Sequence, residues 1–135
     1  MIVDASVLAR VVMPSQFDPK VAAVLARPGL RAPPNLRIEI GHVLTKKLRA
    51  RQISRAQLET IWRDIDGLPI RIMPPPSWAL AMSLCVDLNI VFNDACYLAA
   101  AVQHEDLLVT ADDRLVAAAR SRSDTSPRVL SIAEL

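Results

Sequence analysis

Apolar residues occur along this chain in short, nearly continuous runs rather than in alternation with polar residues. Runs of this length are typical of strands buried on both faces, and they lie at residues 1–4, 30–33, 69–73, 106–110 and 128–131. Between them, apolar side chains recur every three or four positions, which predicts helices. The predicted helices cover residues 5–13, 18–27, 35–48, 54–67, 77–89, 93–103 and 112–122. Strands alternating with helices predict one α/β domain over residues 1–135, a three-layer α/β/α fold with a short parallel sheet.

The long helix that begins near residue 35 carries an unexpected acid. Asn35 is expected to cap this helix. The positions predicted on its packed side are Ile38, Gly41, Val43, Leu44 and Leu48. Glu39 lies at the border of that side, and a carboxylate is rarely buried unless it is paired or bound to a cation. Either Glu39 reaches water at the edge of the helix, or a positive group lies opposite it.

Composition limits the class of protein. The chain of 135 residues is 52% hydrophobic but only 4% aromatic, so its core is expected to be aliphatic. The 22% of charged residues argues against disorder, and a net charge of +2 permits an acidic partner without requiring one. Cys85 and Cys96 fit no metal-binding spacing and are interpreted as small buried hydrophobes in a reducing compartment.

The amino-acid pattern predicts a cytoplasmic protein. Residues 1–14 lack a basic start, and Asp4 interrupts their apolar run, so they do not resemble a signal peptide. No uncharged run approaches the roughly 18 residues of a membrane span.

Four acids are expected at one edge of the sheet. Asp4 and Asp112 follow predicted strands, Asp94 begins a helix, and Glu39 lies near the start of another. In parallel α/β sheets, ligands bind beyond the carboxyl ends of the strands. Each Asp could simply cap a helix, and Glu39 could be solvated. Together, however, four carboxylates would repel one another unless cations lay between them, and all-oxygen ligands favour Mg²⁺ or Mn²⁺.

Four segments carry a resemblance that covers nearly the whole chain. The segments "MIVDASVL", "NLRIEIGHVL", "NDACYLAAA" and "LLVTADDRL", in this order, resemble the motifs of PIN-domain ribonucleases, in particular VapC-type toxins of toxin–antitoxin pairs. The resemblance implies a PIN-like fold and metal-assisted hydrolysis of RNA, for which one or two Mg²⁺ or Mn²⁺ ions activate water and neutralise phosphate charge. The family's catalytic and metal-binding acids correspond to Asp4, Glu39, Asp94 and Asp112.

Further residues and partners follow from the same resemblance. Ser6 and Thr110 match polar residues that accompany the first and fourth acids, and Asp113 could assist, although helix geometry should turn it away. The implied partners are RNA, a VapB-type antitoxin and a second copy of the chain, with no membrane. Two alternatives stay open: a PIN-domain nuclease of RNA processing, and a catalytically silent RNA-binding module.

Several further features are typical of ordinary helical surfaces. The basic residues Lys46, Lys47, Arg49 and Arg51 could be the solvated end of a helix or could guide RNA. His42 is interpreted as a partly buried or surface histidine. Trp62 and Trp78 are too isolated to predict base stacking. The strongly apolar helices at residues 5–13 and 21–26 predict surface that a monomer leaves exposed for a partner.

Overall fold

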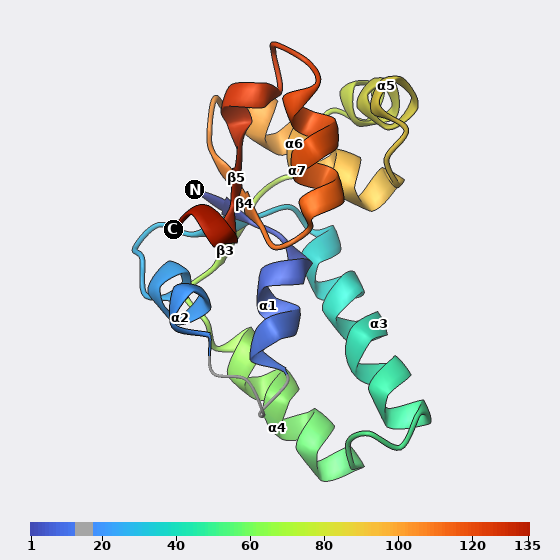
Figure 1. Ribbon diagram of the computed structural model, residues 1–135. Coiled ribbons are helices and arrows are strands. Elements are labelled where there is room, and N and C mark those ends of the chain that lie inside the picture. The colour runs from blue at the N-terminus through green and yellow to red at the C-terminus, as the bar shows by residue number, and fades with distance from the viewer. Residues whose placement is uncertain (13–17) are drawn as a thin grey trace.

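The computed structural model describes residues 1–12 and 18–135 (Figure 1). It contains one parallel five-stranded sheet with the order β3-β2-β1-β4-β5. The strands are β1 (Ile2–Val3), β2 (Arg31–Ala32), β3 (Arg71–Ile72), β4 (Leu108–Thr110) and β5 (Val129–Ser131). All five predicted strands and their parallel direction are therefore confirmed.

Seven α-helices are present in the described part of the chain. They are α1 (Ala5–Val11), α2 (Pro19–Leu25), α3 (Asn35–Arg49), α4 (Arg55–Asp66), α5 (Trp78–Leu88), α6 (Phe92–Gln103) and α7 (Asp113–Arg120). Two short 3₁₀ helices, η1 (Ser126–Arg128) and η2 (Ile132–Glu134), flank β5. Local sequence sets several boundaries: Asp18 caps α2 with Pro19 at its first position, and Ser54 forms a capping box with Gln57. Met13, predicted to end the first helix, lies outside the described residues.

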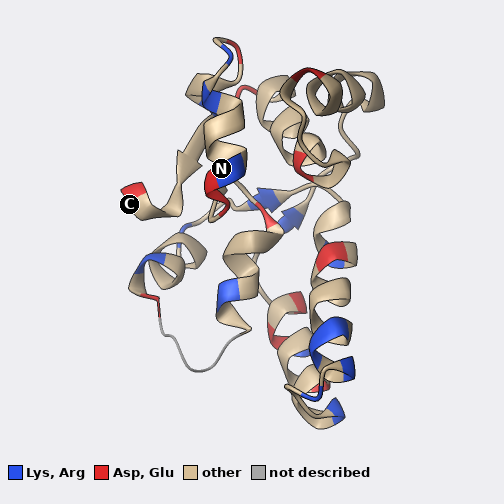
Figure 2. Cartoon of the chain, turned by 45° about the vertical axis from the view of Figure 1, so that its right-hand side comes forward, with Lys and Arg blue, Asp and Glu red and all other residues tan. Residues whose placement is uncertain are grey.

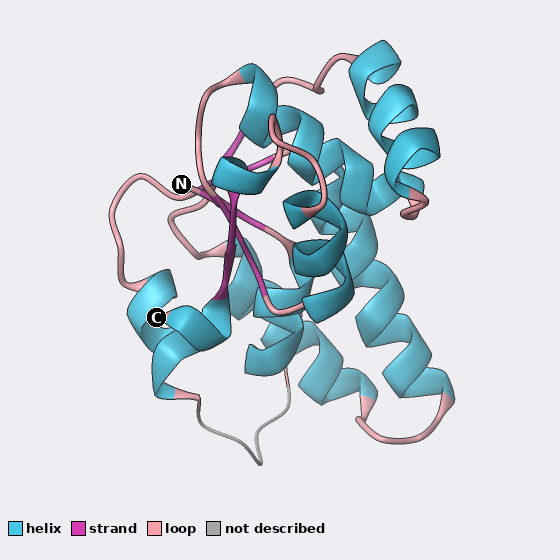
Figure 3. Ribbon diagram, turned by 45° about the horizontal axis from the view of Figure 1, so that its top comes forward, coloured by secondary structure: helices cyan, strands magenta, loops and turns pink. Residues whose placement is uncertain are grey.

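The two faces of the sheet are buried by different helices, which gives the predicted three layers (Figure 3). Successive side chains of a strand point to opposite faces. Ile2 and Leu108 accordingly belong to a large core with α3, α5, α6 and α7. Val3 and Val109 belong to a smaller core formed with α2, Leu30 and Ile132. The short strands are thus enclosed on both sides, as their unbroken apolar runs predict.

The packed side of α3 differs from the prediction. Its buried residues are Leu36, Ile40 and Leu44, whereas Ile38 is 61% exposed. The reason is the position of α4, which packs along the side of α3 that carries Gly41. A Cβ on Gly41 would lie 3.9 Å from the Trp62 ring. Ile38 therefore faces outward, away from the neighbouring helices.

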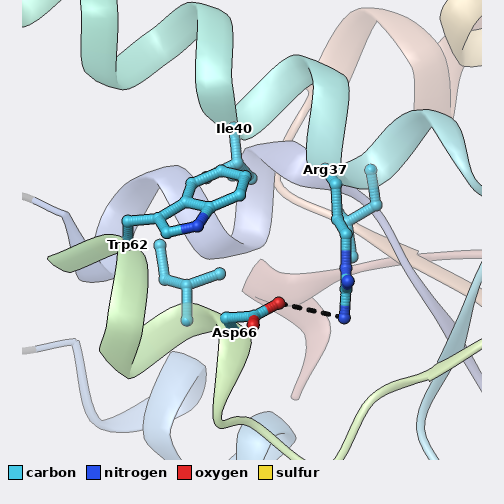
Figure 4. Close-up of a pocket in the computed structure, with 6 residues that line it drawn as sticks. Arg37, Ile40, Trp62 and Asp66 are labelled. Atoms are coloured by element: carbon cyan, nitrogen blue, oxygen red, sulfur yellow. Dashed lines mark ion pairs between the residues drawn. The ribbon is translucent and has the colours of Figure 1, made fainter. Parts of the chain in front are cut away.

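A small apolar recess lies between α3 and α4, shown in Figure 4. The Trp62 ring lies over Ile40, and Arg37 forms an ion pair with Asp66 at 3.0 Å across the mouth of the recess. This packing accounts for Trp62 as a residue that joins two helices.

Exposed apolar side chains lie elsewhere than predicted. In α1 and α2, most apolar residues are buried, and Val11, at 46%, is their main exposed large side chain. The exposed large residues concentrate instead on α5 and the start of α6: Trp78, Met82, Val86, Val91 and Phe92. The prediction of an exposed apolar surface on the first two helices is wrong, because both faces of those helices pack against the sheet and its neighbours.

Two smaller expectations are met in part. Cys96 is buried, but Cys85 is only half-buried and its thiol donates to the carbonyl of Ile90. Within the described ranges, no single helix has the length and apolar character to cross a membrane; only α5 and α6 taken together reach them, across a 118° bend.

Candidate functional site

Asp4 lies directly after β1, where it caps α1 and is 3% exposed. One carboxylate oxygen accepts hydrogen bonds from the backbone amides of Ser6 (3.0 Å) and Val7 (3.2 Å) and from the Ser6 hydroxyl (2.6 Å). Its other oxygen accepts one from the Thr110 hydroxyl. Burial raises the pKa of Asp4 above its usual value, while these hydrogen bonds act in the opposite direction. Asp4 is therefore held rigidly by four donors.

Asp112 occupies the equivalent place after β4. It caps α7 by accepting from the amides of Arg114 (2.8 Å) and Leu115 (3.3 Å), and its own amide donates to the Thr110 hydroxyl at 3.0 Å. The capping interpretation is thus correct for Asp4 and for Asp112. It does not exhaust their role, because both side chains also line a cavity.

Glu39 and Asp94 reach the same cavity from two helices. Asp94 lies in the first turn of α6. Glu39 lies in α3 and accepts a hydrogen bond from the side-chain amide of Asn35 at 2.9 Å. Asn35 was predicted to cap α3, but it is the first helical residue and Pro34 precedes it as the cap. Its side chain orients Glu39 instead, across the four-residue spacing at which helical side chains meet.

The four predicted acids line one open cavity of about 350 Å³. The other lining residues include Ser6, His42 and Val43, and no Lys or Arg is among them. The acids therefore lack a basic side chain to balance them in the cavity wall formed by the described residues. Asp113 is exposed and is not a lining residue, in agreement with the geometric objection to it.

Electrostatics shows that the carboxylates act on one another. Burial raises the pKa of Asp94 to about 6, and the charges of Asp112, Asp4 and Glu39 add to the shift in that order. Burial also raises the pKa of Glu39, with a contribution from Asp4 and an opposing one from the Asn35 hydrogen bond. Mutual repulsion of this kind is what a bound cation would relieve.

The donor set suits a hard divalent cation. Every ionised group at the cavity offers oxygen, the ligand that Mg²⁺ and Mn²⁺ prefer. Among the residues that the structure describes, no three Asp, Glu, His or Cys side chains form a closed ligand group. The carboxylates surround the space rather than converge on one point, so the arrangement fits ions bound with water as well as protein oxygens.

Two residues near the site were not selected from the sequence. His42 is an exposed residue on the cavity wall, three positions after Glu39. Tyr97 is fully buried on α6, and Glu39 is close enough that, after burial, its charge is the largest cause raising the pKa of Tyr97. The Tyr97 hydroxyl nonetheless makes no hydrogen bond of normal geometry within the described residues. Its position three residues after Asp94 is the only sequence signal that could have indicated it.

Comparison with known families identifies the fold. A model of the PIN domain matches residues 1–121. The chain belongs to the PIN domain family. PIN domains are generally nucleases and typically use divalent metal ions.

A solved structure agrees with this assignment. The "Crystal structure of PAE2754 from Pyrobaculum aerophilum" aligns with a TM-score of 0.73 and 20% sequence identity, over 98% of this chain and 83% of that chain. At this identity the likeness establishes the PIN-like α/β/α fold. Comparison with curated protein sequences gives no match.

Proposed function

We propose that this PIN domain is a metal-dependent endoribonuclease that acts as a VapC-type toxin. The observation that carries the proposal is the cavity itself: four carboxylates from four different elements line it, and no Lys or Arg lies among the lining residues. An uncompensated group of acids at the carboxyl ends of parallel strands has little structural value. It is well suited to hold cations that bind phosphate.

Asp4, Glu39, Asp94 and Asp112 would hold one or two Mg²⁺ or Mn²⁺ ions. When bound, such ions supply a charge that activates water and stabilises the negative phosphate. In hydrolysis, the water oxygen forms a new bond to phosphorus and loses a proton. The ester P–O bond breaks, and the leaving oxygen takes up a proton.

The chain's own contribution is orientation. Ser6 and Thr110 fix the two oxygens of Asp4, and Asn35 fixes Glu39. Ligands held in advance lose less entropy when substrate arrives.

The test is cleavage of purified total RNA by the purified protein. We expect cleavage with Mg²⁺ or Mn²⁺, none with EDTA, and none by Asp94→Asn. Asp113→Asn is a matched control, because Asp113 is exposed, lies beside Asp112 and does not line the cavity. Its activity should equal that of the unaltered protein. A folded protein that binds RNA without cutting it would refute the nuclease and favour the silent binding module.

The toxin role adds two partners, a VapB-type antitoxin and a second copy of the chain. Its support is the resemblance of the four motif segments to VapC-type toxins. Expression of the protein alone should arrest growth, and coexpression of a small DNA-binding protein encoded next to it should restore growth. RNA cleavage in vitro without growth arrest would instead favour a nuclease of RNA processing.

A further inference from the structure

One face of α3 joins the acidic cavity to a row of basic side chains. From Glu39, the positions His42, Lys46 and Arg49 follow at intervals of three, four and three residues. Side chains at these intervals lie on the same face of a helix. Glu39 and His42 line the cavity, so the face that enters the cavity continues along α3 toward its carboxyl end. Figure 2 shows this order, with acid near the sheet and basic residues toward the far end of α3.

The basic side chains of this row are accessible. His42, Lys46 and Arg49 are exposed. Among the described residues, neither Lys46 nor Arg49 forms an ion pair. By contrast, Arg37 on the α4 side of the same helix is paired with Asp66. The positive charges that share a face with Glu39 are therefore the ones left for an external anion.

The spacing suits a nucleic acid strand. At 1.5 Å per residue, Lys46 lies about 10 Å and Arg49 about 15 Å beyond Glu39 along the helix axis. With about 3.4 Å per nucleotide of a stacked strand, these lengths correspond to roughly three to five nucleotides. A strand whose phosphate lies in the cavity would thus bring later phosphates to the two basic residues.

Neither the helix dipole nor an acidic peptide accounts for the whole face. Basic residues near a helix carboxyl end interact favourably with the helix dipole, but that effect requires no particular face. An acidic peptide could also bind the row, but its carboxylates would add to the negative charge at the cavity. RNA fits both ends of the face, given cations in the cavity.

We propose that single-stranded RNA lies along this face of α3, with Lys46 and Arg49 binding phosphates about three to five nucleotides from the bond in the cavity. The inference rests on the proposed function, because it takes the cavity as the place of cleavage. It gives Lys46 and Arg49 a role in substrate binding and none in the chemical step.

The experiment compares two double variants that remove the same charge. Lys46→Ala/Arg49→Ala alters the row, whereas Arg27→Ala/Arg63→Ala alters exposed residues after α2 and on α4. Binding of a fluorescein-labelled 12-nucleotide RNA of mixed sequence is followed by anisotropy in EDTA at several NaCl concentrations. Each lost phosphate contact should reduce the slope of log K against log salt by about 0.7. The row variant should therefore bind roughly 20-fold more weakly at 0.1 M NaCl, and the control should match the unaltered protein.

A four-nucleotide RNA should show no such difference, because it is too short to reach the row. The melting temperature should be unchanged, since both side chains are exposed. Equal salt slopes for the row variant and the control would overturn the proposal. So would equal competition by a polyglutamate peptide of the same charge as the RNA, which would indicate an acidic protein partner.

The outcomes for this inference and for the nuclease are separate. If the unaltered protein cleaves RNA but the row variant keeps the normal salt slope, the RNA path is wrong and the nuclease stands. If no cleavage occurs but the slope changes as expected, the row binds RNA and the proposed nuclease is wrong.

Discussion

The hydroxyl of Thr110 donates a hydrogen bond to the carboxylate of Asp4, although 106 positions separate the two residues. The parallel pairing of β1 with β4, in register Val3 with Val109, places the ends of the two strands side by side. The same hydroxyl accepts a hydrogen bond from the amide of Asp112 at 3.0 Å. One side chain therefore links the first and fourth acids of the cavity.

Replacing Thr110 by Val should destabilise the protein. The substitution keeps the shape of the side chain but leaves buried Asp4 without one donor and the Asp112 amide without its acceptor. Leaving such groups unsatisfied costs about 1–3 kcal/mol each. We expect the free energy of unfolding to fall by about 2 kcal/mol or more in urea denaturation at pH 7.

Thr60→Val is the matched control for this variant. Thr60 is exposed on α4 and donates only to a carbonyl of its own helix. Its replacement should change stability by no more than about 0.5 kcal/mol. Equal effects of the two substitutions would contradict the linking role of Thr110.

The carboxylate cluster should make the metal-free protein less stable as the pH rises. The pKa of Asp94 is about 6 in the folded chain, against an ordinary value of 3.8. Between these values the folded form binds more protons than the unfolded form, so the free energy of unfolding falls as pH increases through this window. The raised pKa values of Glu39 and buried Asp4 act in the same direction.

Melting temperatures measured in EDTA between pH 4 and pH 7.5 test this expectation. Asp94→Asn removes the titrating group, so its melting temperature should decline less than that of the unaltered protein over the window. Parallel curves for the two proteins would show that Asp94 does not titrate near 6. Addition of Mg²⁺ or Mn²⁺ at pH 7 should raise the melting temperature of the unaltered protein more than that of the variant.

The sequence predicted the edge of the sheet better than the surfaces of the helices. Asp4 and Asp112 could be placed together because each follows a buried apolar run, and parallel strands present their carboxyl ends at one edge. Ile38 could not be placed, since α3 carries apolar residues on more than one side. Which side is buried depends on where α4 packs, and that is a property of the tertiary structure.

The same limit explains the errors about exposed apolar surface. The Ala- and Val-rich segments of α1 and α2 are consistent with either buried or exposed helices. They are buried here because they cover the sheet. Trp78 was considered isolated because Phe92 is 14 positions away in sequence. The hairpin of α5 and α6 brings the two rings together, with centroids 6.2 Å apart.

Gly41→Ala should stabilise the protein. Gly41 lies in the interior of α3, and an added Cβ would make an ordinary contact with Trp62 at 3.9 Å. Alanine is favoured over glycine within a helix by about 0.5–1 kcal/mol, because it loses less backbone entropy on folding. Gly29→Ala should have the opposite effect, since Gly29 has a φ of +76° that an L side chain rarely adopts. Chemical denaturation of both variants checks the signs; destabilisation by Gly41→Ala would mean that α3 and α4 pack more closely than the structure shows.

The proposed homodimer should depend on the exposed apolar row of α5. Trp78, Met82 and Val86 recur every four residues on this helix and are 57%, 54% and 71% exposed. A twofold interface brings the same patch of both copies together, so a charge placed in the row is introduced twice and buried. Met82→Glu should therefore convert the dimer to a monomer, measured by light scattering after size-exclusion chromatography. Thr60→Glu, an exposed position on α4, should leave the dimer intact. If Met82→Glu also stays dimeric, the two copies associate through another face, and the row on α5 remains open to a different apolar partner.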